Sequence, residues 1–124
     1  MKPTPSYDAA ANIIVNALAL AAISHHWHLM TKSYAQHVTL GDLYLYCHEI
    51  ADTLTEKLIG AGAEFPDSGG KLTFALSPPS RAIPELEAFT KSFNDITEPP
   101  WLANIAQEIQ GSLNNTLYKL KRLS

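Results

Sequence analysis

The sequence predicts an all-α protein, with four helices in a single domain that spans residues 1–124. Apolar residues recur at three- and four-residue steps in several long segments, which is the spacing of one helix face. Prolines and glycines gather in one long stretch and one short break, and these divide the chain into two pairs of helices. Hydrophobic residues make up 46% and charged residues 17%, enough apolar material for one core.

The first two predicted helices are separated by only a residue or two. The first should begin near residues 6–8, where Ser and Asp are good N-caps, and should run to about Thr31. The second should begin at Ser33, which forms a capping box with Gln36, and should end at the glycines that begin with Gly60. Two helices joined so closely must form an antiparallel hairpin.

A connection of about 20 residues, 62–82, follows the hairpin and is unusually long for a compact domain. Prolines and glycines in this connection exclude a long helix or strand: Pro66, Gly69, Gly70, Pro78 and Pro79. An extended segment at 72–76 would have no sheet to join. The connection is long enough to cross a bundle from end to end. A third, short helix should begin near Pro84, and a long fourth helix should follow Pro99 and Pro100.

Charge and cysteine content favour a cytoplasmic protein that does not bind DNA. The net charge of −3 provides no basic field for nucleic acid. The basic cluster Lys119–Arg122 is expected to complement the dipole of a helix C-terminus. Cys47 is the only cysteine, so no intramolecular disulfide forms and a reducing compartment is the simpler expectation.

Residues 9–24 are strongly apolar but are expected to form a buried helix, neither a membrane span nor a signal peptide. The run is shorter than the ~20 residues that a span needs, and Asn12 and Asn16 interrupt it. The residues before it, with one Lys and Asp8, make a poor signal-peptide start. A helix that is apolar on nearly every side needs more than one neighbour, and another subunit could supply part of that cover.

Two histidines and two carboxylates form the candidate metal site: His26, His37, Asp52 and Glu56. Asp52 and Glu56 lie one turn apart on one helix face, where two like charges disfavour each other unless a cation lies between them. Imidazole and carboxylate suit iron, zinc or manganese. Asp52 lies about 22 Å from His37 along one helix. A single site with all four residues therefore requires a two-fold dimer, in which each site takes residues from both subunits.

These residues carry a resemblance to a known family. The pattern His26-Trp27, His37 and Asp52-x-x-x-Glu56 resembles Dps proteins, which are mini-ferritins, over residues 20–62. The resemblance implies a ferritin-like four-helix bundle with a long crossover between the second and third helices. It also implies a homo-oligomer that oxidises and stores ferrous iron at an inter-subunit site. Two features depart from the family: the gap between the histidines is one residue short, and Gly41 replaces a carboxylate.

An alternative reading comes from the segment 31–37, which also resembles small phage-encoded proteins of unknown function. The alternative is a degenerate ferritin-like bundle, phage-encoded, that acts as a structural or host-interaction protein in the host cytoplasm without catalysis. The missing carboxylate at Gly41 and the short third helix favour it. Whether the protein is an enzyme stays open at this point. The remaining polar and aromatic residues of the hairpin are interpreted as surface polarity or packing: His25, His28, His48, Tyr44 and Tyr46.

Overall fold

The structure, a computed structural model, describes residues 7–65 and 72–124. These form four α-helices and two short 3₁₀ turns: α1 (Asp8–Met30), α2 (Tyr34–Gly60), η1 (Pro79–Arg81), α3 (Ala82–Ser92), η2 (Phe93–Asp95) and α4 (Pro100–Arg122). The described ranges contain no strand, so the prediction of an all-α protein is confirmed. The candidate cap Ser6 and the middle of the long connection, residues 66–71, lie outside the described residues.

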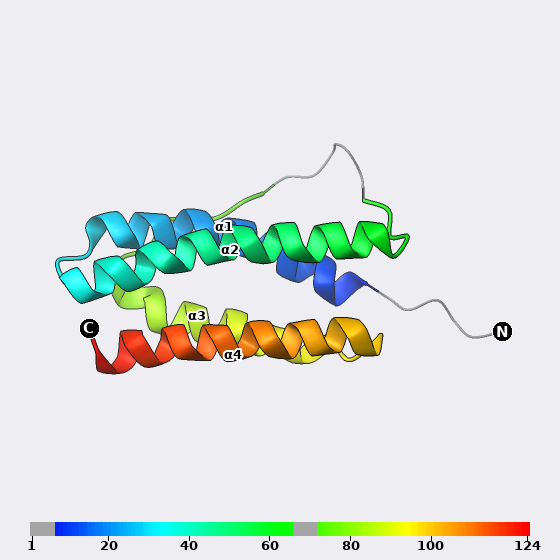
Figure 1. Cartoon of the computed structure of the whole chain (residues 1–124). Helices are drawn as coiled ribbons and strands as arrows, with labels where there is room; N and C mark the ends of the chain where they lie inside the picture. Colours follow the sequence, from blue (N-terminus) through cyan, green and yellow to red (C-terminus); the bar gives the residue numbers. More distant parts are fainter. Residues whose placement is uncertain (1–6, 66–71) are drawn as a thin grey trace.

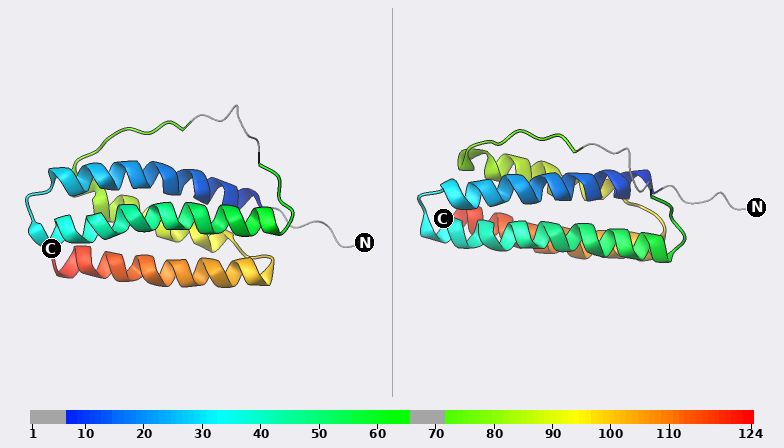
Figure 2. Two further views of the ribbon diagram at one scale, coloured as in Figure 1. Left: turned by 45° about the horizontal axis from the view of Figure 1, so that its top comes forward. Right: turned by 90° about the horizontal axis from the view of Figure 1, so that it is seen from above.

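The helices lie in two antiparallel pairs (Figure 1). α1 and α2 form one pair, and α3 and α4 pack beneath them as the second. α2 and α3 run in the same direction, and both views in Figure 2 show that α2 ends and α3 begins at opposite ends of the bundle, so the connection has to span its length. The long connection therefore has the crossover role that its length predicts. α3 and α4 pack along one side of the α1–α2 hairpin. The other side of the hairpin therefore faces away from both of them.

The tight turn between α1 and α2 is held by side-chain hydrogen bonds. The Ser33 hydroxyl accepts the Gln36 N–H at 3.1 Å, which confirms Ser33 as the N-cap of α2. In a complete capping box the Gln36 side chain would also accept the Ser33 N–H, but here that hydrogen bond is replaced. Gln36 Oε1 accepts a hydrogen bond from the Thr31 hydroxyl, and Thr31 Oγ1 accepts the Ser33 N–H at 3.3 Å. Thr31 takes this place because the turn is so short that its hydroxyl reaches the first turn of α2.

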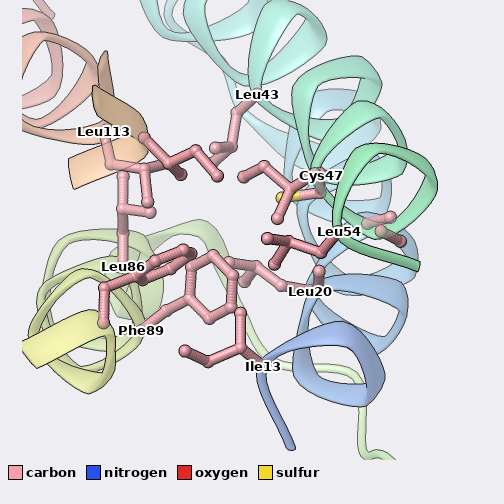
Figure 3. Close-up of a cluster of buried hydrophobic side chains, with 14 of the residues drawn as sticks. Ile13, Leu20, Leu43, Cys47, Leu54, Leu86, Phe89 and Leu113 are labelled. Atoms are coloured by element: carbon pink, nitrogen blue, oxygen red, sulfur yellow. The ribbon is translucent and has the colours of Figure 1, made fainter. Parts of the chain in front are cut away.

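Buried side chains from all four helices meet in one core. Figure 3 shows this cluster at mid-bundle, with labelled residues from each helix: Ile13, Leu20, Leu43, Cys47, Leu54, Leu86, Phe89 and Leu113. Trp27 is fully buried near the end of α1, and its Nε1–H donates to Ser77 Oγ at 3.1 Å. This bond fastens the end of the crossover to α1.

Helices α4 and α1 each depart from a simple amphipathic pattern. In α4 the buried row begins at Leu102, which is 1% exposed, whereas the neighbouring Trp101 is 37% exposed. α1 buries eight residues but also exposes Val15 and Leu18. By length and composition alone α1 could cross a membrane, a test that buried helices of soluble proteins pass as well.

Candidate metal site and histidine cluster of the α1–α2 hairpin

Three of the four candidate ligands lie on the outward face of the hairpin. Asp52 and Glu56 are exposed on α2, and at about 100° per residue Glu56 lies opposite the buried Cys47. His26 is half-buried on α1. It lies nine residues after the buried Ala17, which at about 100° per residue places the two on opposite faces of the helix. Within the described ranges, none of these three side chains has a hydrogen bond or an ion pair. They are therefore free to bind an external group.

His37, the fourth candidate, is paired with His28 and not with His26. The two rings stack with centroids 3.8 Å apart and an interplanar angle of 17°. Nδ1 of His28 lies 2.6 Å from the carbonyl oxygen of His37, and Nδ1 of His37 lies 2.8 Å from the carbonyl oxygen of His28. Because a carbonyl oxygen only accepts, both Nδ1 atoms carry the proton. Each ring keeps only Nε2 for any further partner.

The stacked pair belongs to a larger group of rings at the turn end of the hairpin. His25 stacks on Tyr44 at 4.2 Å, and the Tyr44 ring meets His28 edge-on at 5.5 Å. Tyr34 lies 6.4 Å from His37 on the other side. The rings come from both helices, so His25 and His28 pack across the hairpin, although the sequence suggested only surface polarity. We call His25, His28, Tyr34, His37 and Tyr44 the histidine cluster.

The histidine cluster also explains why position 41 of α2 is a glycine. A Cβ added at Gly41 would lie 3.0 Å from His28 Cε1 and 3.1 Å from His28 Nδ1, tighter than nine in ten real Cβ contacts. The His28 ring thus occupies the space of a side chain at position 41, where the Dps pattern has a carboxylate. A glycine inside a long helix is itself a signal of close approach, because it costs about 1 kcal/mol relative to alanine. In the sequence Gly41 is noted only as a departure from the Dps pattern, although a glycine inside a helix is the signal that could have indicated this contact.

A comparison with protein families matches residues 28–120 to a Family of unknown function (DUF5856). The match covers about three quarters of the chain. This chain belongs to that family. No curated protein and no solved structure matches the chain. The DUF5856 match includes His28, His37, Asp52 and Glu56, and it begins after His26.

Within one DUF5856 subunit, the candidate ligands do not form a metal site. Among residues 7–65 and 72–124, no three His, Cys, Asp or Glu side chains are close enough together to hold an ion. The stacked rings of His28 and His37 do not form a chelating pair either, because nitrogen lone pairs lie in the ring planes and these planes are nearly parallel. A metal would have to draw its ligands from two subunits, as the sequence geometry requires.

Cys47 is not available for metal binding or catalysis in the folded subunit. Its side chain is fully buried among the core residues of α2. Burial raises the pKa of the Cys47 thiol to about 12 because the thiolate would lose its solvation. A neutral, buried thiol is a poor nucleophile and a poor ligand. Cys47 therefore acts as a small hydrophobic residue of the core.

Proposed function

We propose that this DUF5856 member is a ferritin-like four-helix bundle that binds a transition metal, iron first of all, between two subunits. The observation that carries the proposal is that His26, Asp52 and Glu56 have no partner in the described structure and share the outward face of the hairpin. Two carboxylates one turn apart, with imidazole available, form a ligand set suited to iron, zinc or manganese. The parallel course of α2 and α3, with a long crossover between them, supports the ferritin-like arrangement.

A two-fold dimer of the hairpins would complete the site. His26 lies near the turn, whereas Asp52 lies roughly 16 Å farther along the hairpin at about 1.5 Å of rise per residue. If a second copy packs on the outward face in the opposite direction, its Asp52 and Glu56 come level with His26 of the first copy. Symmetry forms the same site twice. The proposed ligands are thus separated within a subunit but adjacent in the dimer.

The same face carries apolar side chains that a dimer would cover. Exposed apolar residues alternate with the candidate ligands along both helices: Val15, Leu18 and Leu29 on α1, and Val38, Leu45 and Ile59 on α2. Apolar residues gathered on one face of a soluble protein commonly mark an interface. Leu45 is 58% exposed and lies between the turn and Asp52, near the middle of the proposed contact.

The ligand set favours binding of one metal ion over two-metal oxidase chemistry. His37 can join only through Nε2, because its Nδ1–H is used on the His28 carbonyl. A metal-bound histidine usually has such a second hydrogen bond, which fixes its orientation. A side chain at position 41 would have to displace the His28 ring, which lies 3.0 Å from the place of its Cβ. Oxidation of ferrous iron by oxygen or peroxide is the further activity to measure once binding is established.

Metal binding can be measured on chelator-treated protein with Fe²⁺ under anaerobic conditions, and with Zn²⁺ and Mn²⁺. We expect about one ion per subunit by elemental analysis, together with a dimer or larger species by native mass spectrometry. The variant Asp52→Asn with Glu56→Gln should lose the ion. The control Asp42→Asn with Glu49→Gln removes the same charge from exposed positions of the same helix and should keep it. Wild-type protein that binds none of the three metals would refute the proposal.

One observation favours a second candidate function. The His28 ring packs against Gly41, at the position where the Dps pattern has a carboxylate ligand. This part of the hairpin therefore favours a packing role over metal binding. The alternative is a degenerate bundle that acts as a phage-encoded structural or host-interaction protein. It predicts a stoichiometric host partner in a pull-down, retained by the double variant of Asp52 and Glu56. Metal-dependent capture would count against this alternative.

A further inference from the structure

α4 lies on the side of the bundle opposite the α1–α2 hairpin (Figure 1), and the face that it turns away from its buried row carries a stripe of exposed residues. Its members recur at three- and four-residue steps and are all exposed: Glu108, Gly111, Asn115, Tyr118 and Arg122. In the described part of the chain, none of the four side chains in this stripe has a hydrogen bond or an ion pair. Tyr118 is 52% exposed, a large ring with no neighbour to cover it. We call this set the α4 stripe.

Gly111 at the centre of the stripe has no explanation within one subunit. A Cβ added there would meet nothing within 4 Å, in contrast to Gly41, whose Cβ would meet the His28 ring. A glycine inside an exposed helix costs about 1 kcal/mol relative to alanine. Close approach of another backbone or of a flat ring is a common use of such a position. The open side of Gly111 faces outward, so it leaves room for a flat ring or a backbone of another molecule to approach.

The charges of α4 are divided between its two halves. Glu108 lies in the first half and borders a cavity of about 370 Å³ between α2 and α4, which Glu49 and Lys57 also line. The basic residues lie in the last turn. Lys121 is paired with Glu87 of its own chain at 3.3 Å, which leaves Arg122 exposed and without a partner among the described residues. An antiparallel partner of the same sequence would bring Arg122 to Glu108, whereas a parallel partner would oppose like charges.

We propose that α4 pairs with α4 of a second copy of this chain, antiparallel and around a two-fold axis at Asn115. Glu108 and Arg122 lie at equal distances from Asn115, about 10 Å each along the helix. The axis therefore sets each Glu108 against an Arg122. Gly111 lies four residues before Asn115 and Tyr118 lies three residues after it, so the Tyr118 ring of one copy comes within about one residue of Gly111 of the other. Asn115 meets its own copy at the axis. Symmetry makes the carboxylate–guanidinium and ring–glycine contacts twice.

This interface goes beyond the metal-binding proposal because it lies on the opposite side of the bundle from the hairpin face. A subunit with both two-fold contacts would assemble into a species larger than a dimer. Loss of either contact alone would leave a dimer held by the other. The two proposals can therefore fail separately, and the mass of the assembly shows which one has failed.

The experiment is a charge exchange measured by sedimentation velocity and native mass spectrometry on the full chain. Glu108→Arg and Arg122→Glu should each weaken the α4 contact about ten-fold or more, because each converts two attractive pairs into repulsive ones. The double variant restores opposite charges across the axis and should recover the wild-type mass. Lys121→Glu is the matched control for Arg122→Glu. It makes the same charge change on a side chain directed at Glu87 of its own subunit, and should leave the assembly intact.

Circular dichroism confirms that each variant is folded before its mass is interpreted. A wild-type monomer, or single variants with unchanged mass, would overturn the α4 contact. Weakening in both singles without recovery in the double would overturn the antiparallel register. Leu45→Glu on the hairpin face separates the two proposals. If it leaves the mass unchanged while the α4 variants reduce it, the α4 contact holds and the hairpin dimer of the metal-binding proposal does not.

Discussion

His28 and His37 each direct Nδ1 at the backbone carbonyl oxygen of the other, at 2.6 Å and 2.8 Å, with their rings stacked 3.8 Å apart. The pair joins the last turn of α1 to the first turn of α2. The His28 carbonyl lies in the last turn of α1, where no helical N–H reaches it, and the His37 side chain supplies its donor. The turn end of the hairpin is thus held by a symmetric pair of polar contacts in addition to its apolar core.

Loss of either ring should destabilise this end of the hairpin. We expect His28→Ala and His37→Ala each to lower the free energy of unfolding by about 1–2 kcal/mol, because each removes a stacked ring and a hydrogen bond. The double variant should cost less than the sum, since the rings contact each other. Urea denaturation measures these values. His48→Ala, at an exposed position of the same helix, is the control and should change stability little. Strict additivity of the two single variants would contradict direct coupling.

Gly41 should not tolerate a side chain. Gly41→Ala is expected to cost about 1–3 kcal/mol, because the new Cβ would meet the His28 ring at 3.0 Å and the ring is tied to a carbonyl. Gly41→Asp, which would restore the Dps carboxylate, should cost more. The matched control in α2 is Gly60→Ala, where the added Cβ meets nothing within 4 Å. Thermal unfolding of the three variants tests this, and a stabilising Gly41→Ala would contradict the close contact.

The crossover should loosen when its bond to Trp27 is removed. Ser77→Ala leaves the Trp27 Nε1–H without its acceptor, at an expected cost of about 1–2 kcal/mol. Limited proteolysis of the crossover should also become faster. Ser80→Ala removes an exposed hydroxyl from the same segment and serves as the control. Equal proteolysis rates in the two variants would show that this bond does not hold the crossover.

Cys47 should make stability depend on pH in alkaline solution. Its folded-state pKa of about 12 lies above the ordinary value of 9.0, so the folded protein keeps a proton that the unfolded chain releases. The free energy of unfolding should therefore fall as pH rises above 9.0 and stop falling near 12. The slope from this one group is about 1.4 kcal/mol per pH unit.

Comparison with Cys47→Ala isolates that effect from other groups that titrate in alkaline solution. The difference in stability between wild type and Cys47→Ala should shrink by about 1 kcal/mol over the first pH unit above the ordinary thiol pKa, and by up to about 1.4 kcal/mol over the next unit. A thiol reagent such as dithionitrobenzoate should react with wild type only as fast as the protein unfolds. Rapid labelling of the native protein would show that the thiol is accessible.

The sequence by itself determined the helices and their connections. Local rules sufficed: apolar spacing marked the helices, Ser33 capped α2, and glycines and prolines ended α2 and placed the breaks. The short turn required a hairpin, and the long connection predicted a crossover. These features depend on interactions within a few residues of the chain, so the sequence contains the evidence for them.

Only the tertiary structure decided which side chains meet across the hairpin. His26 and His28 differ by little in distance from the turn, and spacing alone did not determine which of them reaches His37. The rotation of α1 against α2, set by packing of the whole core, selected His28 and directed His26 outward. The same rotation brought the His28 ring onto Gly41 and kept Asp52 and Glu56 on the outer face. Helix phase at an interface is a collective result of packing, so local sequence patterns do not determine it.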